Sequence, residues 1–390
     1  MRMGNTLRAA GLAAIVFILA SGCAKERDIP SNGDAKFFFD SWIQLNCPGI
    51  EPYGSGIYIM DDDEGTGEAV ADSQFVYLSY VATDLEGTIT DYTEESTARM
   101  LGEYDETSGR YYGPRIWTRA SGFMYGGVNE MLTGMRQGGT RKAVIPGWLM
   151  SNTWYGSEQE YLDNASGTNS IYTVTVVDPI QNITQWQIDS IGRFLAGGYR
   201  SHDFGYLDLG TYIEKNGITS AKDSSDMYGF YFIEIEHGQE LNNDDSSDSG
   251  DGGDTSDGYD WEDSHFFTTS DSNDTTIYIN YVGRLLNGKV FDTNIKRVAD
   301  DNNLSGGDYT PMAIQWADSY SELIMGTSDS TPNMITGFAM TLWRMHPFGK
   351  AIGIFYSNYG YGYSGSGNTI PAYSPLMFEI EVVENPDDND

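Results

Sequence analysis

The chain carries two segments in which apolar and polar positions alternate in the same way. Residues 75–81 read Phe-Val-Tyr-Leu-Ser-Tyr-Val, and residues 276–282 read Thr-Ile-Tyr-Ile-Asn-Tyr-Val. Alternation with a period of two is typical of a strand with one buried face. In each half a Gly follows the last Tyr by seven residues and an Asp follows it by eleven. In the second half that Gly belongs to Asn287-Gly288, a strong hairpin signal.

Other apolar segments repeat in the same order around these strands. A short strand pattern precedes them in each half, and a helix pattern and two strand patterns follow. The segments are 56–60, 128–135, 141–146 and 171–176 in the first half, and 229–235, 338–345, 350–354 and 376–382 in the second. Internal repetition of this kind indicates two copies of one structural unit. We therefore predict an α+β fold of two units, each a curved antiparallel β-sheet wrapped on a short helix.

The regions between the repeats differ in character. Ile188, Ile191 and Leu195 fall at helical spacing and predict a linking helix over 184–196. Residues 244–274 hold eleven acidic residues and no Lys or Arg, which predicts a disordered acidic insertion. A calcium loop is the alternative, but the Asp spacing does not fit an EF-hand. The predicted organisation is a signal peptide at 1–22, a lead-in at 23–55, a first unit at 56–178, a helical linker at 179–228, and a second unit at 229–384 with the insertion at 239–274.

The N-terminus has the pattern of an export signal. Arg2 and Arg8 lie before an apolar run, Ala9 to Ala20. This run is too short to span a bilayer and has the length of the apolar part of a signal peptide. Small residues then precede Cys23, which resembles the lipobox of bacterial lipoproteins. The resemblance implies a lipid on Cys23 and, because no Asp follows it directly, an outer-membrane location facing the periplasm or the cell surface. Ordinary cleavage after Gly22 is the alternative.

Composition narrows the function classes. The 390 residues carry a net charge of −35, which argues against nucleic acid as a partner because phosphate contacts need a basic surface. Aromatic residues reach 13%, more than a disordered chain would hold. Cys47 is the second of two Cys, so no disulfide framework is expected once Cys23 is lipidated. The four His are scattered without metal-ligand spacing, so we expect neither a metal nor a cofactor.

The second half resembles the FKBP-type peptidyl-prolyl cis-trans isomerase family over about residues 276–384. The matching segments keep the order and spacing of that family, although none is specific alone. They are residues 281–292, 334–338, 361–362, 369–371 and 376–380. With its export signal and two copies, the chain resembles a tandem FKBP-like lipoprotein of a Bacteroidetes-like bacterium.

The family's reaction explains why such residues suit it. Rotation about an X–Pro bond has a barrier of about 20 kcal/mol because the planar amide loses resonance. A catalyst needs only to bind the twisted amide better than either planar form. An apolar pocket with aromatic walls and a few fixed donors does so without proton transfer or a covalent intermediate.

The resemblance implies a role for each matched residue. The Tyr361 hydroxyl and the Ile335 amide would donate hydrogen bonds to substrate, and Asp292 would set the polar edge beside the twisted amide. The side chains that would line the proline pocket are Tyr281, Phe291, Met312, Met334, Phe338, Ile370 and Phe378. Met312 stands at a usually aromatic position and Thr369 replaces an apolar residue. Inward-facing aromatics are also what an ordinary core requires, so Tyr361 and Asp292 discriminate best.

The first copy departs further from the family. Thr90 stands at the position of Phe291, and Val128 stands at the floor position of Phe338. Tyr155 is the candidate match for Tyr361, and residues 163–167 read as a polar loop in place of the expected Ile-Pro. We therefore predict an FKBP-like fold without isomerase activity.

These observations predict a prolyl isomerase that assists the folding of exported proteins. Its partners would be proline-containing exported polypeptides, and its N-terminal lipid anchor would hold it on a membrane. The alternatives are a non-catalytic surface lipoprotein that binds a protein or a glycan, and a holdase chaperone that binds unfolded clients irrespective of proline.

Overall fold

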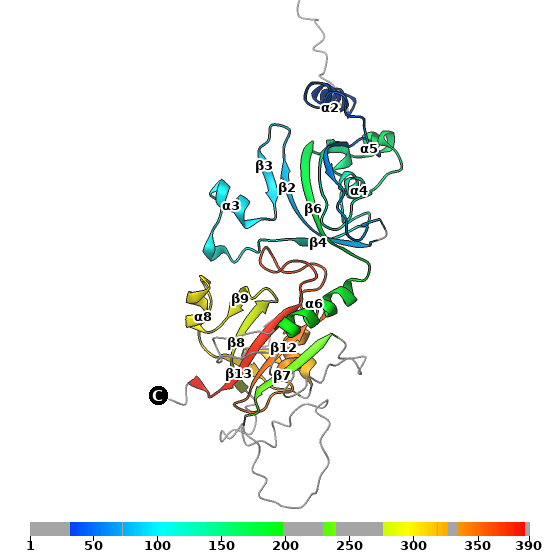
Figure 1. The fold of residues 1–390 in the computed structure, drawn as a ribbon. Coiled ribbons are helices and arrows are strands. Elements are labelled where there is room, and N and C mark those ends of the chain that lie inside the picture. Colours follow the sequence, from blue (N-terminus) through cyan, green and yellow to red (C-terminus); the bar gives the residue numbers. More distant parts are fainter. Residues whose placement is uncertain are drawn as a thin grey trace, which may run out of the picture.

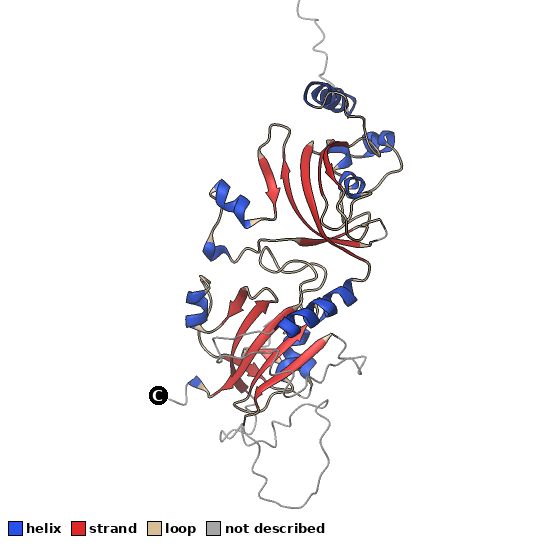
Figure 2. Cartoon of the chain, viewed as in Figure 1, coloured by secondary structure: helices blue, strands red, loops and turns tan. Residues whose placement is uncertain are grey.

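The computed structural model describes residues 32–71, 73–197, 229–238, 276–317, 319–326 and 334–386. They form two α+β units, each built on one antiparallel sheet (Figures 1 and 2). The strands of the first unit are β1 (Tyr58–Asp63), β2 (Phe75–Thr83), β3 (Ile89–Tyr92), β4 (Arg115–Thr118), β5 (Thr140–Ile145) and β6 (Ser170–Ile180). Those of the second are β7 (Phe230–Glu236), β8 (Thr276–Leu285), β9 (Val290–Thr293), β10 (Met312–Gln315), β11 (Ile324–Met325), β12 (Lys350–Phe355) and β13 (Leu376–Val383).

The two sheets have the same topology. The order β1-β5-β6-β2 in the first unit corresponds to β7-β12-β13-β8 in the second. β3 and β4 pair with β2 as β9 and β10 pair with β8. The register agrees as well, since Tyr80 lies opposite Val174 and Tyr281 lies opposite Ile380. The predicted fold class and internal repeat are therefore confirmed.

A short helix packs against each sheet at a glycine. These helices are α4 (Gly126–Leu132) and α9 (Thr336–Leu342). A Cβ on Gly127 would clash with Ile145 at the end of β5, and one on Gly337 would clash with the ring of Phe355 at the end of β12. The absence of a side chain at one equivalent position thus lets each helix lie directly on its sheet.

The remaining helices sit at the edges and at the junction. They are α2 (Asn32–Asn46), α3 (Glu95–Leu101), α5 (Glu158–Asn164), α6 (Ile183–Gly197) and α8 (Lys296–Asp301), with 3-10 turns at Glu106–Ser108, Gly147–Leu149, Tyr320–Glu322 and Ser357–Tyr359. The predicted linking helix is confirmed as α6. Its Ile191 and Leu195 pack with Tyr231, Ile233 and Ile352 of the second sheet.

One sequence-based expectation about these helices was wrong at residues 163 and 164, whereas residues 165–167 do form a loop. Residues 163–167 were expected to be a polar loop, but α5 extends to Asn164. The helix is stabilised at its start by Ser157, whose hydroxyl accepts from the Glu160 amide at 3.3 Å, and by the burial of Tyr161. A seven-residue helix with one buried apolar residue leaves little periodic pattern to detect.

Several expectations lie outside the described residues. The signal peptide, Cys23, residues 198–228 and the acidic insertion are among them. Within the described segments, no helix combines the length and the hydropathy that crossing a membrane would require.

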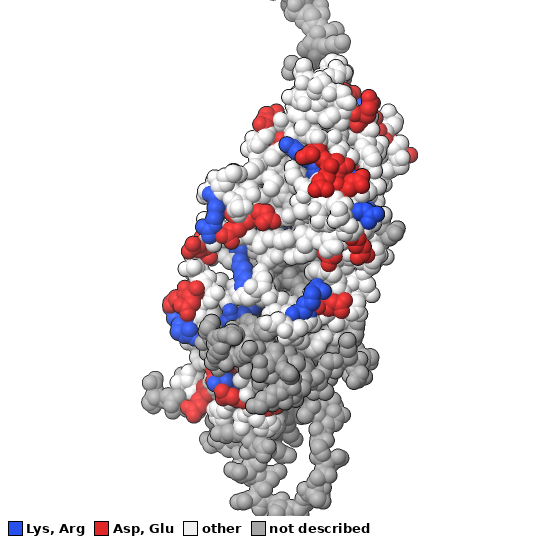
Figure 3. Space-filling model, in the orientation of Figure 1, with Lys and Arg blue, Asp and Glu red and all other residues white. Residues whose placement is uncertain are grey.

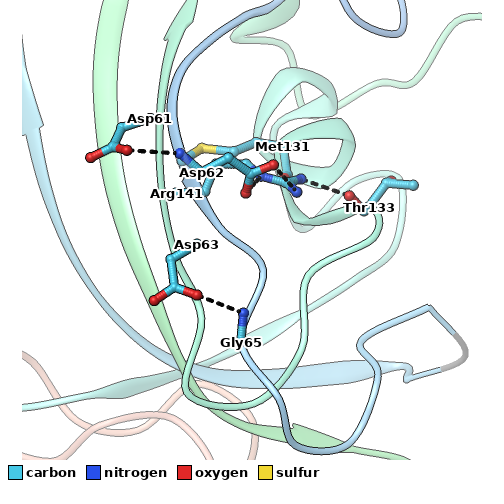
Figure 4. Close-up of polar contacts among 7 residues, drawn as sticks. All are labelled: Asp61, Asp62, Asp63, Gly65, Met131, Thr133 and Arg141. Carbon is cyan, nitrogen blue, oxygen red and sulfur yellow. Dashed lines mark hydrogen bonds and ion pairs between the residues drawn. The ribbon is translucent and has the colours of Figure 1, made fainter.

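The first unit contains a buried arginine at a position where the second has Ala351. Arg141 on β5 is 3% exposed and pairs with both carboxylate oxygens of Asp62, at 2.8 and 2.9 Å. It also donates to the carbonyl oxygens of Met131 and Thr133, each at 2.7 Å (Figure 4). The side chain therefore ties β1 to the end of α4.

Candidate functional site

Four aromatic side chains from four elements of the second unit converge. Tyr281 comes from β8, Phe291 from β9, Phe338 from α9 and Phe378 from β13. The Phe378 ring is edge-on to Phe291 at 5.5 Å and to Phe338 at 5.0 Å, and Tyr281 is edge-on to Phe338 at 5.7 Å. The matched residues, dispersed over almost 100 positions, thus form one aromatic cluster.

A glycine makes room for this cluster. Gly283 on β8 lies opposite both Asp292 and Phe378 in the sheet. A Cβ there would lie 2.7 Å from the Phe291 ring and 2.8 Å from the Phe378 ring. The sequence-based assignment overlooked Gly283, and also Phe355, whose ring stacks on Phe378 at 6.0 Å.

A tyrosine–carboxylate pair forms the polar edge of the cluster. The Tyr281 hydroxyl donates to Oδ2 of Asp292 at 3.0 Å. Burial raises the pKa of the Asp292 carboxyl, while the bonds from Tyr281 and the Thr293 amide oppose this increase. Burial and the neighbouring Asp292 charge together raise the pKa of Tyr281. The pair therefore consists of a carboxylate with a reduced tendency to ionise and a tyrosine that keeps its proton at neutral pH.

The backbone of Tyr281 is held by the two residues that follow Asp292. The Tyr281 amide donates to Oδ1 of Asn294 at 2.8 Å, and its carbonyl accepts from the Thr293 hydroxyl at 2.6 Å. Asn294 also donates to the carbonyls of Ile279 and Thr310. These contacts fix the geometry of the Tyr281–Asp292 pair. In the sequence, the polar residues Thr293 and Asn294 at the end of a strand were the signal that could have revealed them.

Of the two predicted donors, Tyr361 lies near Asp292 and Ile335 lies at the start of α9. Tyr361 is 37% exposed, and burial together with the Asp292 charge raises the pKa of its hydroxyl. Ile335 precedes α9, and its carbonyl accepts from the amides of Phe338 and Ala339. Within the described part of the chain, neither the Tyr361 hydroxyl nor the Ile335 amide donates a hydrogen bond. Both remain available to a bound molecule.

The predicted rim residues belong to or pack against the same core as the cluster. Met312, on β10 opposite Ile279, is half-buried against the second core, as are Met334 and Ile335. Ile370 is 4% exposed and belongs to the same core as Phe338 and Phe378. The structure therefore brings all ten site residues of the second unit to one region, and their roles remain predictions.

The first unit keeps the polar pair but alters its surroundings. The Tyr80 hydroxyl donates to Oδ2 of Asp91 at 2.6 Å. Thr90 stands at the position of Phe291, and the Trp117 ring lies 4.7 Å from that of Tyr80. Tyr125 precedes α4 as Ile335 precedes α9. The match of Tyr155 to Tyr361 stays a prediction; the Tyr155 ring packs edge-on against Tyr161 of α5.

Within the part of the chain that the structure describes, no group of three or more His, Cys, Asp or Glu side chains could hold a metal ion.

The solved structures that this chain resembles include peptidyl-prolyl isomerases and FKBP-type proteins, whereas no family model and no curated sequence matches it. A peptidyl-prolyl cis-trans isomerase from Pseudomonas syringae is 20% identical, with a TM-score of 0.26, over 52% of this chain and 94% of its own. FkpA from Escherichia coli is 21% identical, with a TM-score of 0.26, over 45% and 73%. The three FKBP domains of wheat FKBP73 are 12% identical, with a TM-score of 0.24, over 84% and 94%. Identities and TM-scores this low assign no role to any residue of this chain.

Proposed function

We propose that the second unit is a peptidyl-prolyl cis-trans isomerase that acts on X–Pro bonds of exported polypeptides. The observation that carries the proposal is the convergence of the aromatic cluster with the Tyr281–Asp292 pair and two unused donors. A proline ring fits against aromatic faces, and the donors suit carbonyl oxygens of the flanking peptide.

The catalytic effect would come from preferential binding of the twisted amide. A rotated X–Pro amide has lost resonance, so its carbonyl is less well solvated than in either planar isomer. The aromatic walls hold the ring, while the Ile335 amide and the Tyr361 hydroxyl fix the chain on either side. Asp292 supplies a fixed polar edge beside the bond that rotates.

The two related units provide a matched experiment. Isomerisation of a proline peptide is followed with the full chain and with Asp292→Asn and Asp91→Asn variants. Asp292→Asn is expected to reduce kcat/KM by about 10-fold or more, the equivalent of one lost transition-state hydrogen bond or charge. Asp91→Asn changes the same pair in the first unit and should leave kcat/KM unchanged. No acceleration by the wild-type chain, or equal effects of the two substitutions, would disprove the proposal.

We further propose that a lipid on Cys23 anchors the protein to the outer membrane. The lipobox-like sequence supports this proposal, which stands apart from the isomerase activity. Cys23→Ala expressed in a bacterial host should move the protein from the membrane to the soluble fraction and abolish incorporation of labelled palmitate. Cys47→Ala, at a buried free Cys, is the control and should remain membrane-bound.

A binding role without catalysis is the second candidate, and one surface favours it. α2 buries Phe39 and Ile43 in the first core but leaves Phe37, Phe38 and Leu45 exposed at 76, 55 and 81%. Exposed apolar side chains of this size suit unfolded clients. If this role is primary, the full chain suppresses aggregation of a proline-free client, and a Phe37→Ser/Leu45→Ser double variant loses that effect while retaining isomerase activity.

A further inference from the structure

The first unit keeps the polar pair of the candidate site in the same place on its sheet. The Tyr80–Asp91 hydrogen bond joins β2 to β3 as the Tyr281–Asp292 bond joins β8 to β9. Asp91 lies opposite Ala82 as Asp292 lies opposite Gly283. The strand registers therefore allow the two sites to be compared position by position.

Hydrogen-bonding side chains replace apolar ones around this pair in the first unit. By strand register, Arg115 on β4 stands at the position of Met312. Tyr172 on β6 stands at the position of Phe378. Together with Thr90, these replacements exchange much of the apolar wall for groups that donate or accept hydrogen bonds. A site of this composition suits a ligand with several polar groups better than it suits a proline ring.

Tyr172 is a buried tyrosine whose hydroxyl is unused. The residue is 7% exposed. Its hydroxyl makes no hydrogen bond with any described residue, and the oxygen is open to solvent. Burial raises the pKa of this hydroxyl, and the neighbouring Tyr125 and Asp91 add to the increase, so it is a neutral donor at physiological pH. Its partner in the free protein is therefore water, which a ligand can replace.

Arg115 lies on the same face of the sheet as the polar pair. Residues of β4 alternate between the two faces, so Arg115 and Trp117 share one face, and the Trp117 ring lies 4.7 Å from that of Tyr80. Burial and Asp91 raise the pKa of Tyr80, and the charge of Arg115 opposes them, which places the guanidinium near the pair. Nε is enclosed, whereas the two terminal nitrogens are open and form no hydrogen bond or ion pair with the described residues.

The charges of this site balance, and aromatic rings border it. Asp91 contributes one negative charge and Arg115 one positive charge. On the face drawn in Figure 3, Lys and Arg side chains of the first unit are scattered among Asp and Glu and form no broad basic area. Trp117 is half-buried, and Tyr125, directly before α4, is 38% exposed. Neighbouring acceptors and donors suit hydroxyl groups, because each hydroxyl both donates and accepts.

We propose that the first unit binds a neutral sugar residue of a glycan at this site, which consists of Tyr80, Asp91, Arg115, Trp117, Tyr125 and Tyr172. Asp91 accepts from one sugar hydroxyl, and Arg115 and Tyr172 donate to others. The C–H face of the sugar packs against the Trp117 ring, as an apolar ring would. The site residues come from the first unit alone, so the inference is independent of the isomerase activity of the second unit.

The test measures glycan binding by the full chain. Labelled protein is applied to an array of neutral and acidic oligosaccharides, and the Kd of the strongest neutral ligand is then measured by isothermal titration calorimetry. Tyr172→Phe deletes only the hydroxyl and should raise this Kd about 3- to 10-fold, the usual effect of losing one hydrogen bond. Tyr363→Phe removes the hydroxyl of a 67% exposed tyrosine of the second unit and should leave the Kd unchanged.

Two further variants make the test independent of folding. Asp91→Asn should weaken binding about 10-fold or more, because a charged acceptor is lost. Tyr125→Ala lies at the exposed edge and should also raise the Kd, with circular dichroism unchanged from the wild type. The inference is overturned if no neutral glycan on the array binds, if acidic glycans alone bind, or if the Kd is the same in Tyr172→Phe and in the wild type.

Discussion

At the scale of single residues, the candidate site depends on one missing side chain. Gly283 lies between the rings of Phe291 and Phe378, where any Cβ would be too close to both. In the first unit the position on β2 that corresponds to Gly283, judged from strand register, is Ala82, which lies opposite Tyr172 as Gly283 lies opposite Phe378. The first unit therefore has neither this glycine nor the pocket phenylalanine, whose position is taken by Thr90.

Gly283→Ala is expected to damage the pocket more than the fold. The added methyl forces the two rings apart, so KM for a proline peptide should rise, while overpacking reduces the free energy of unfolding by about 1–3 kcal/mol. Steady-state kinetics and urea denaturation measure the two effects. Ala82→Gly, the reciprocal change in the first unit, should leave kinetics unaltered; an unchanged KM in Gly283→Ala would show that the rings do not contact substrate.

The pH dependence of activity should report on Asp292. Its pKa is raised by burial, so on acidification it takes up a proton at a higher pH than an ordinary Asp does. Because the folded-state pKa lies above the unfolded one, ionised Asp292 costs stability at neutral pH, and protonation relieves that cost as the pH falls through the raised pKa. We therefore expect kcat/KM to fall on acidification while this contribution to stability rises. Both changes should be absent in Asp292→Asn. They are measured as the pH profiles of kcat/KM and of the free energy of unfolding in urea.

At the scale of elements, the two units use the same topology with different anchors. The second unit packs α9 on β12 through apolar contacts around Phe355, whereas the first also ties α4 to β1 through Arg141. Burying an arginine is favourable only when its donors are satisfied, and here Arg141 makes four hydrogen bonds, two to Asp62 and one each to the carbonyls of Met131 and Thr133. The first unit therefore depends on a polar network where the second depends on packing.

Arg141→Lys should destabilise the first unit. A lysine cannot maintain the two-pronged contact with Asp62 together with both carbonyl contacts, so the free energy of unfolding should fall by about 2–3 kcal/mol. Arg136→Lys is the control, since this exposed arginine donates only to the Gly67 carbonyl and its replacement should cost no more than about 0.5 kcal/mol. Urea denaturation followed by tryptophan fluorescence measures both, and equal effects would contradict a structural role for the buried network.

At the scale of the whole molecule, the first unit supports a loop of the second. The Tyr111 amide donates to the Asn368 carbonyl at 2.8 Å, and the Tyr373 hydroxyl bonds that of Thr118. α6 adds a buried contact, in which Gln187 accepts from the Ser357 amide at 2.8 Å. The segment from Asn368 to Tyr373 also contains Ile370 of the candidate pocket. The first unit therefore helps to position a segment of the second unit that contains a predicted pocket residue, whether or not the first unit binds a ligand.

Tyr373→Asn should uncouple the two units. Asn tolerates the positive φ, so the change removes the ring and the hydroxyl without adding backbone strain. Calorimetry of the variant is expected to resolve two transitions, or to show a loss of about 1–2 kcal/mol from the coupled unfolding. Tyr363→Asn alters a 67% exposed tyrosine of the same loop and should have no such effect; identical thermograms for wild type and Tyr373→Asn would show that the junction carries no coupling.

The sequence by itself determined the repeat and the longer strands, whereas its assignment of the pocket residues stays a prediction. Alternation around Tyr80 and Tyr281 placed β2 and β8, and the spacing of Ile191 and Leu195 placed α6. These features are local, because a hydrophobic periodicity and the residues of a turn can be recognised within about ten consecutive residues. The α5 helix escaped detection, since its few residues are fixed by Ser157 and by the contact of Tyr161 with the core.

Only the tertiary structure decided how these pieces act together. The proximity of Gly283 to two rings and the hydrogen bonds of the buried Arg141 each join residues from separate elements. The Tyr281–Asp292 pair was visible as a spacing of eleven residues, but its hydrogen bond depends on the register of β8 against β9. Contacts of this kind are set by packing among distant segments, and a local pattern does not encode them.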